Sequence, residues 1–413
     1  MTDRISEDEL ADRSGSSPER IRELAHLGII EPESGLFKRR DVMRVRVVGQ
    51  LGSIGIEADA LAAALASGHL TLGYLESAGR QYPRSNLTFA EMAEEIGVPL
   101  LTLISIYIAF GLPRPEGDEL ILEEDLEAVK VVGILFAAGL DEQDVIRMAR
   151  VWGDSTRRVA QYLPHYFHNI IEDRFRQSGL GDNEAYEAAL REVGLRVGRS
   201  GEDLLGWLFR RHSDVFGIEH QFEHVETALE QAGVRRRPTR QVETVVFADL
   251  TGFTQLTEES GDDVAAEVAV TFAQLASEVA ARYRGNVVKL LGDGVFLKFP
   301  DADDAVMASL EIVESTPSRG LPEAHIGVNA GPMLYDEGDY FGRTVNIAAR
   351  IASKAGAAEV YVGEPVVDVV SGNGFRLTEI GEFQLKGIAS PVRIFRAEPR
   401  ASAPRESARG PSD

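Results

Sequence analysis

The sequence predicts an α+β domain over residues 241–398, preceded by an all-α region with helix-turn-helix-like repeats. Two observations lead to this prediction. Apolar residues recur at helical spacing through much of the first 233 residues, whereas from Glu243 short β-branched segments alternate with glycine turns and helical stretches. The length of 413 residues also exceeds what one hydrophobic core usually serves, so we expect at least one domain boundary.

The composition limits the class of protein. The net charge of −23 argues against a chain-wide surface for nucleic acid or anionic lipid, because such surfaces are basic. The lack of cysteine excludes disulfides and thiolate chemistry. The N-terminus has no signal-peptide pattern, and the longest apolar run, residues 100–112, is shorter than the ~20 residues that span a bilayer. We therefore expect a cytoplasmic protein without a transmembrane segment.

The first 150 residues contain a degenerate repeat. ELADRSG at 9–15 aligns with EMAEEIG at 91–97, and VVG at 47–49 aligns with VVG at 131–133. Each copy reads as a short helix, a glycine turn, a second helix, a loop and a longer helix, which is the order of a helix-turn-helix with a small wing. The first copy, residues 1–75, resembles the DNA-binding head of the MerR family.

The charges of these modules favour a regulatory or dimerising use of the scaffold over DNA binding. Residues 1–50 hold nine Lys and Arg against ten Asp and Glu, a net charge of −1. A segment with this charge is only weakly attracted to DNA phosphates. The matching helix of the second copy, LLTLISIYIAF at 100–110, has no charge, so we expect it to be buried or to line a fatty-acid pocket. The first copy does offer cations where a DNA reader would have them: Arg20, Arg22, His26, Lys38, Arg39 and Arg40.

The spacing over residues 85–233 predicts a helical domain that ends in a long linker helix. Five of the eight histidines lie in this segment: His165, His168, His212, His220 and His224. They are either surface residues or, because histidine titrates near neutral pH, a pH-sensing group. His220 and His224 have the i,i+4 spacing of zinc ligands, but the residues between them do not match the metalloprotease pattern, so no metal is expected there. Three arginines and a proline at 235–238 predict a linker.

From Glu243 the predicted elements form a mixed or antiparallel sheet covered by helices. They are, in order, strand 243–249, helix 262–283, strand 287–291, strand 295–299, helix 303–314, strand 325–331 and helix 343–354. Residues 399–413 are expected to form a disordered tail.

Two carboxylates are placed where a metal site would need them. Asp249 ends the first strand of the domain, and Asp293 lies in the turn between the second and third strands. If these strands are neighbours, both side chains project from one edge of the sheet. Such hard oxygen ligands suit Mg²⁺ or Mn²⁺ held jointly with substrate phosphates. Either residue alone could equally be a turn or capping residue, and His325, at the start of its strand, is expected to be structural.

Four motifs in this domain resemble the catalytic domain of the class III nucleotide cyclases. They are FADLTGFT at 247–254, GNVVKLLGDGVFLKF at 285–299, GDYFGRTVNIAAR at 338–350 and LKGIASPV at 385–392. The resemblance covers residues 243–397 and implies a ferredoxin-like βαββαβ core for the domain at 241–398. The helical region at 85–233 resembles the regulatory domains of bacterial cyclases.

The resemblance also implies roles for individual residues. Asp249 and Asp293, with the main-chain carbonyl of Leu250, would bind two divalent metal ions. Lys289 and Asp339 would read adenine, one as a donor to ring N1 and the other as an acceptor for the exocyclic amine. Guanine presents the opposite pattern at those atoms, so ATP is expected rather than GTP.

A second set of residues would act on the ribose and the phosphates. Asn346 and Arg350 match the pair that orients the ribose and stabilises charge at the α-phosphate, and their i,i+4 spacing puts both on one helix face. Lys386 and the main chain at Gly252 and Phe253 would hold the triphosphate. In the family each active site is shared across a head-to-tail dimer. Because this chain contains both halves, the resemblance implies a symmetric homodimer.

The sequence therefore predicts an adenylate cyclase that converts ATP to 3′,5′-cyclic AMP and pyrophosphate by two-metal catalysis in a homodimer. Its N-terminal helical domain would regulate it in response to pH or a lipid. The alternative is a nucleotide-responsive DNA-binding regulator with a cyclase-like domain, which would require sequence-specific DNA binding by residues 1–75.

Overall fold

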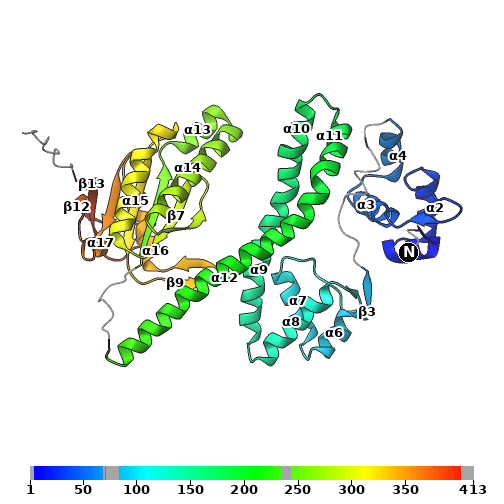
Figure 1. Cartoon of the computed structure of the whole chain (residues 1–413), viewed down its shortest axis with the longest axis horizontal. Coiled ribbons are helices and arrows are strands. Elements are labelled where there is room, and N and C mark those ends of the chain that lie inside the picture. The colour runs from blue at the N-terminus through cyan, green and yellow to red at the C-terminus, as the bar shows by residue number, and fades with distance from the viewer. Residues whose placement is uncertain (1–3, 68–69, 71–82, 235–242, 401–413) are drawn as a thin grey trace, which may run out of the picture. The chain divides into compact units, whose positions relative to one another are not determined.

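The computed structural model describes residues 4–67, 70, 83–234 and 243–400, which Figure 1 shows as a ribbon. The chain divides into two compact units, Met1–Gly217 and Ile218–Asp413. The linker predicted at 235–238 and residues 401–413 of the predicted tail lie outside the described residues.

The N-terminal repeat consists of two modules with the same order of elements. The first contains β1 (Arg4–Ile5), α1 (Glu7–Ser14), α2 (Pro18–His26), β2 (Phe37–Lys38) and α3 (Asp41–Ser53), followed by α4 (Ala58–Ala66). The second contains β3 (Arg84–Thr88), α6 (Phe89–Glu95), α7 (Leu100–Ala109), β4 (Leu120–Leu122) and α8 (Asp125–Ala137). In each module the two strands pair antiparallel as a small wing. The side chains of Ser6 and Thr88 cap the first helix of their modules.

The prediction that the uncharged helix α7 is buried is only partly right. Leu103 and Ile106 are fully buried, in the cores shared with α6 and with α8. Leu101 and Ile108, however, are 73% and 50% exposed. The physical reason is geometric: the neighbouring elements cover only part of the cylinder, so a helix without charges can still leave one stripe open.

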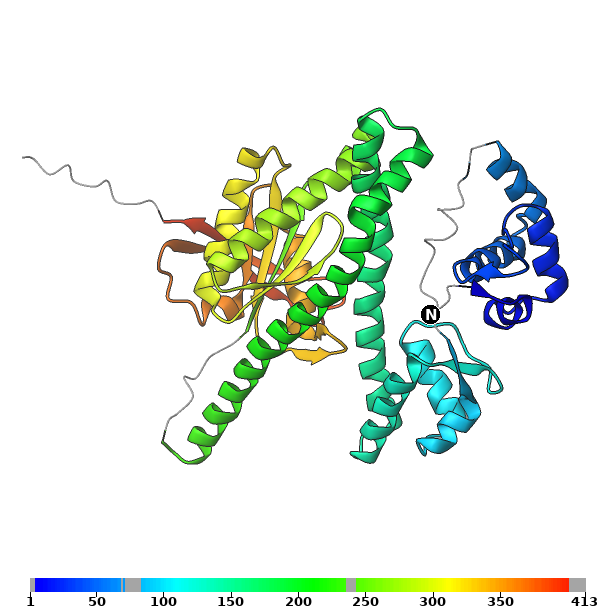
Figure 2. The same ribbon diagram turned by 45° about the vertical axis from the view of Figure 1, so that its right-hand side comes forward.

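A helical hairpin follows the second module, and Figure 2 shows its two arms. The first arm contains α9 (Glu142–Tyr166), a π-helical turn η1 (Phe167–Glu172) and α10 (Asp173–Gln177). The second contains α11 (Asp182–Ala189), a second π-helical turn η2 (Leu190–Gly194) and the 37-residue α12 (Leu195–Gln231). The Phe167 and Tyr186 rings meet edge to face, 6.1 Å apart, and join the arms. Apolar side chains of α12 are exposed: Leu204, Leu205, Trp207, Phe209, Val215, Phe216, Ile218, Phe222 and Val225.

The C-terminal domain is built on a seven-stranded sheet in the order β12-β13-β11-β8-β5-β7-β6. Its first half contains β5 (Thr244–Leu250), α13 (Phe253–Ser260), α14 (Asp262–Arg282), β6 (Asn286–Leu290), β7 (Gly294–Phe299), α15 (Ala302–Ser315), the 3₁₀ turn η3 (Pro317–Arg319) and β8 (Ala324–Ala330). Its second half contains β9 (Leu334–Asp336), β10 (Asp339–Phe341), α16 (Arg343–Ala352), β11 (Val360–Gly363), α17 (Glu364–Val367), β12 (Phe375–Phe383) and β13 (Val392–Pro399). β8, β5, β7 and β6 pair antiparallel, and this arrangement confirms the predicted ferredoxin-like βαββαβ core. β11 joins β8 in parallel, so the sheet is mixed.

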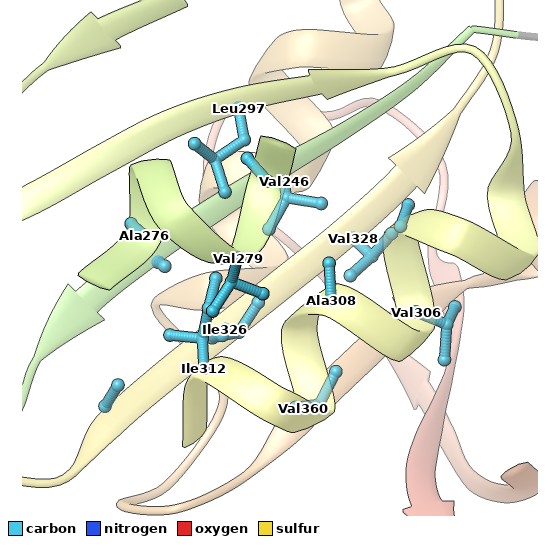
Figure 3. Packing of buried hydrophobic residues seen from close by; sticks show 14 of the residues in the cluster. Val246, Ala276, Val279, Leu297, Val306, Ala308, Ile312, Ile326, Val328 and Val360 are labelled. Carbon is cyan, nitrogen blue, oxygen red and sulfur yellow. The ribbon is translucent and has the colours of Figure 1, made fainter. Parts of the chain in front are cut away.

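One face of this sheet carries the main core. Val246, Leu297 and Ile326 point from the strands toward α14 and α15, where Val279 and Ile312 point back (Figure 3). All five are fully buried. Among the described helices taken singly, only α14 is long and apolar enough to cross a membrane. Its Phe272, Leu275 and Val279 side chains are buried in this core.

The other face is covered in part by α16. The helix lies directly on β8 because Gly327 has no side chain: a Cβ there would be 2.1 Å from the Ala352 nitrogen and 2.4 Å from the Ala348 oxygen. Asn329, two residues further along β8, is buried and donates to the Thr344 carbonyl in the first turn of α16. These contacts fix the height and register of α16 over the sheet.

Candidate active site

Asp249 lies on the sheet face that α16 partly covers. The antiparallel register places Asp249 opposite Gly294 of β7 and His325 of β8, and directly opposed residues share a face. His325 Nε2 is 3.6 Å from Asp249 Oδ2. Asp293 immediately precedes β7, so the two predicted metal-binding carboxylates are brought to the same end of neighbouring strands.

The surroundings of Asp249 disfavour the ionised form of its carboxyl group. Burial raises the pKa of the Asp249 carboxyl, the charge of Asp293 raises it further, and His325 acts in the opposite direction. A Cβ at Gly294 would be 2.9 Å from Asp249 Oδ1, so glycine is needed there to leave the carboxylate room. Two carboxyl groups that repel each other in this way form a natural cation site, because a divalent ion between them would remove the repulsion.

The residues present fit a Mg²⁺ or Mn²⁺ ion. Within residues 4–67, 70, 83–234 and 243–400, no group of three or more acidic or histidine side chains could hold a metal. Magnesium is, however, commonly held by one or two carboxylates while waters and substrate phosphates supply the other ligands. Leu250 buries its side chain in the core at the end of β5, so only its main chain can serve the site.

Lys289 and Asp339 meet within one chain, although 50 residues separate them. Lys289 Nζ donates to Asp339 Oδ2 at 2.7 Å, and the Tyr340 main-chain nitrogen donates to Oδ1 at 2.9 Å. Lys289 comes from β6, and Asp339 begins β10 of the small β9–β10 hairpin. The pair predicted to read a base is therefore assembled as one donor beside one acceptor.

Asn346 and Arg350 project from α16 as the spacing predicts. The opposite side of the helix is buried through Val345, Ile347 and Ile351. Both Asn346 and Arg350 are exposed, and neither side chain makes a hydrogen bond or ion pair with another residue of the described chain. An amide and a guanidinium without partners are available to a ligand.

The three residues predicted to hold a triphosphate come from two separate segments, the start of α13 and the loop after β12. Lys386 is exposed and follows Leu385, which is buried against Ile347 and Ile351 of α16. Gly252 takes a left-handed conformation, φ 74°, immediately before α13. Phe253 packs its ring against the main core, so only its main chain is offered to a ligand.

Sequence reasoning missed the position of His325 beside Asp249. No local pattern around His325 signals this contact, because it depends on the register between β5 and β8. The ring also lies beside Thr251, with Nδ1 3.4 Å from the hydroxyl oxygen, and so flanks the site from the β8 side.

The five histidines of the helical region fall on two separate stretches of helix. His165 lies on α9 and contacts Asn169, and His168 lies on η1 with Nδ1 2.7 Å from Glu172 Oε2. Glu172 is buried and also accepts a hydrogen bond from Arg176. On α12, the Nε2 atoms of His220 and His224 are 3.0 Å apart and the His212 ring stacks on Phe216.

An apolar cavity of about 280 Å³ lies beside the end of α7 rather than along it. It is formed mainly by α8 and α9 and is lined by Phe110, Ala128, Val131, Val132, Leu135, Val145, Met148, Ala149 and Trp152. The apolar lining is suited to a hydrocarbon ligand.

The cations of the first module are largely engaged by acidic neighbours. Arg20 pairs with Glu23 at 2.8 Å, Arg22 with Glu7 at 3.1 Å and Lys38 with Glu33 at 3.0 Å. Acidic partners of this kind weaken attraction to a phosphate backbone, which favours the regulatory or dimerising use of this module over DNA binding.

Comparison with known proteins finds two matching domain families and several similar proteins. Residues 234–396 match the family described as the adenylate and guanylate cyclase catalytic domain, and residues 33–207 match the adenylate cyclase regulatory domain. A pH-sensitive adenylate cyclase of Mycobacterium tuberculosis is 28% identical over 315 residues, covering 74% of this chain and 76% of its own length. An adenylate cyclase of Streptomyces coelicolor is 27% identical, covering 68% and 70%. Among solved structures, the adenylyl cyclase CyaB of P. aeruginosa matches 38% of this chain and 94% of its own at 24% identity, with a TM-score of 0.36.

Proposed function

The chain belongs to the class III nucleotide cyclases, with an adenylate cyclase regulatory domain before the catalytic domain, and from this premise we propose that it converts ATP to 3′,5′-cyclic AMP and pyrophosphate. The observation that best supports ATP as the substrate is the Lys289–Asp339 pair, because a donor beside an acceptor complements the N1 and amino group of adenine. Purified protein given ATP and Mn²⁺ should form cyclic AMP and pyrophosphate, measured by chromatography. Equal turnover of GTP, or no cyclic nucleotide at all, would overturn the proposal.

Asp249 and Asp293 are proposed to bind the metal ions that take part in catalysis. Asp249 and Asp293 would hold two divalent cations, whose positive charge would offset the repulsion that raises the pKa of the Asp249 carboxyl. When bound, the ions neutralise the triphosphate and make the ribose 3′-hydroxyl a better nucleophile. The main chain before α13 donates to phosphate oxygens, and Lys386 adds a mobile positive charge.

The residues of α16 act on the part of the substrate that changes during the reaction. Asn346 holds the ribose through its side-chain amide, which fixes the direction of the 3′-hydroxyl. Arg350 faces the α-phosphate, where negative charge increases as the new bond forms and pyrophosphate leaves. A planar guanidinium serves this purpose because it can bond two phosphate oxygens at once.

We further propose that each active site combines the carboxylates of one chain with α16 of a second copy in a symmetric homodimer. Two observations support this arrangement. Asn346 and Arg350 are unpaired within the described chain, and large apolar side chains around the site are exposed. The latter are Leu290 and Leu291 at the β6–β7 turn, and Leu334, Tyr335 and Phe341 on the β9–β10 hairpin. The exposed apolar residues of α12 form a further surface that a second copy would bury.

The N-terminal region is proposed to make this activity depend on pH. The relative from M. tuberculosis is named as pH-sensitive, and in the 3.0 Å His220–His224 contact one ring nitrogen must donate a hydrogen bond that the other accepts. Double protonation removes the acceptor and places two positive charges side by side. Full-length protein and the truncated chain 241–413 should therefore show different activity profiles from about pH 5.5 to about 8. His220→Ala should move the full-length profile toward the truncated one, whereas identical profiles for all three would refute sensing by this region.

The apolar cavity favours a second ligand, a fatty acid bound by the regulatory region. Its lining by α8, α9 and Phe110 offers contacts for a hydrocarbon chain. Mass spectrometry of lipid extracted from the purified protein tests this proposal. Trp152→Arg, which puts a charge at the cavity, should remove any lipid found, and retention of that lipid would contradict the assignment.

A further inference from the structure

Lys298 of β7 forms a polar contact that the proposed reaction does not use. Its Nζ donates to Glu243 Oε1 at 2.5 Å and lies over the Tyr340 ring, 4.9 Å from the centroid. The Lys298 side chain is 22% exposed. Glu243 is the residue immediately before β5, so this contact joins the entrance of the catalytic domain to the β9–β10 hairpin.

Tyr340 connects this contact to the base-reading pair. Its main-chain nitrogen donates to Asp339 Oδ1 at 2.9 Å. Its ring lies 4.9 Å from that of Tyr335 and packs against the buried cluster of Val245, Phe296 and Val345. The same residue therefore contacts the Asp339 carboxylate through its main chain and Lys298 through its ring.

The hairpin needs an external anchor of this kind. β9 and β10 are three residues each and, among the strands that the structure describes, pair only with one another; isolated two-stranded hairpins are marginally stable in water. Leu334, Tyr335 and Phe341 of the hairpin are exposed, so much of its apolar surface is not buried by the described residues. Two described contacts tie the hairpin to the sheet through a charge: Lys289 pairs with Asp339 at 2.7 Å, and Lys298 lies over the Tyr340 ring. Of these two lysines, only Lys298 is not assigned to the substrate.

Lys298 keeps its charge throughout the physiological pH range. Burial lowers the pKa of its ammonium group, but interactions with Glu243 and Tyr340 more than offset burial, and the pKa lies above its usual value. The contact with the ring is therefore a constant feature and does not switch with pH.

We propose that Glu243, Lys298 and Tyr340 form a positioning clamp that holds the β9–β10 hairpin so that Asp339 can discriminate adenine from guanine. This inference rests on the proposed function. None of the three side chains is required to touch the substrate, so they are positioning residues. The clamp explains why a lysine is held inward on the site face of β7, where the neighbouring inward positions are Phe296 and Gly294.

The clamp predicts a selective kinetic defect. In Lys298→Met the Lys289–Asp339 pair remains, but Asp339 loses its fixed direction. The KM for ATP should rise, and the preference for ATP over GTP in kcat/KM should fall roughly tenfold, while kcat with ATP changes little because the metal site and Arg350 are intact. Lys298→Arg keeps a cation over the ring and should restore the preference.

Matched controls separate positioning from stability. Lys130→Met removes a similar Lys–Glu bond, Lys130 Nζ to Glu127 Oε1 at 2.8 Å, from α8 outside the catalytic domain, and should leave nucleotide preference unchanged. Tyr340→Phe keeps the ring but removes the hydroxyl that interacts with Lys298, so it should retain most of the preference for ATP, whereas Tyr340→Leu should reproduce the defect of Lys298→Met. Thermal midpoints should be recorded for every variant.

The decisive result is the ATP-to-GTP ratio rather than total activity. A falling ratio in Lys298→Met and Tyr340→Leu, restored in Lys298→Arg, supports the clamp. An unchanged ratio, with or without a lower thermal midpoint, overturns it. If the parent protein makes no cyclic AMP, the proposed function fails on its own. The clamp is then judged by the ratio of ATP and GTP dissociation constants from calorimetry. A changed ratio in Lys298→Met and Tyr340→Leu supports the clamp, and an unchanged ratio overturns it.

Discussion

Asp293→Asn should reduce cyclic AMP formation by at least about 10³-fold, because one carboxylate cannot hold two divalent ions against a triphosphate. The measurement is the initial rate of cyclic AMP formation at saturating ATP and Mn²⁺. Asp263→Asn, which changes an exposed carboxylate in the first turn of α14, is the matched control and should retain full activity. An Asp293→Asn protein as active as this control would contradict the metal assignment.

Asp293→Asn should lower activity but increase the stability of the metal-free protein. Because the folded-state pKa of Asp249 is raised, its contribution to stability is fully present below the usual carboxyl pKa and is lost as the pH rises through the folded value. At neutral pH the metal-free protein therefore bears the repulsion between Asp249 and Asp293. Asp293→Asn should raise the thermal midpoint in EDTA and abolish the further increase caused by Mn²⁺. A lower midpoint in EDTA would show that Asp293 has a structural role instead.

Arg350→Ala should lower kcat by roughly 10² to 10³-fold, since its guanidinium is assigned to charge that develops only as the reaction proceeds. The KM for ATP should change little. The fold should not suffer, because Arg350 is exposed and has no partner among the described residues. Arg343→Ala, at the start of the same helix and also exposed, is the control and should leave kcat near the parent value.

A conservative variant tests whether charge alone is sufficient. Arg350→Lys should recover only part of the activity, because an ammonium group cannot bond two phosphate oxygens in the planar geometry of a guanidinium. A rise in KM with an unchanged kcat in Arg350→Ala would instead assign this residue to binding of the ground state.

The catalytic fold could be predicted from sequence because its signals are local. Strands such as TVVFADL and GVFLKF are rich in β-branched and aromatic residues and end at glycine turns, while α14 and α16 have apolar residues at helical spacing. The placement of Asp249 and Asp293 at the same end of neighbouring strands could be predicted because each follows a strand signal in a recognisable motif. The order of the repeated helices in the first 150 residues was predictable for the same reason.

The features that could not be predicted depend on contacts between distant segments. The Asp249–His325 contact follows from strand register, and the Lys298–Tyr340 contact follows from how a three-residue hairpin folds back over β7. The exposed stripe on α7 was missed because composition indicates whether a helix is apolar but not how many of its sides have neighbours. The short helix α13, which follows FADLTG, was missed because its eight residues are too few for a clear helical period.

The central claim is that each active site takes its carboxylates from one chain and Arg350 from another, and mixing the two inactive variants tests this most directly. Asp293→Asn and Arg350→Ala chains should be combined in equal amounts and allowed to exchange subunits. Each mixed dimer then holds one intact site and one doubly defective site, so activity should recover to about a quarter of the parent value. If the mixture shows only the summed residual rates of the two variants although exchange is demonstrated, all the catalytic groups of a site come from one chain and the account is wrong.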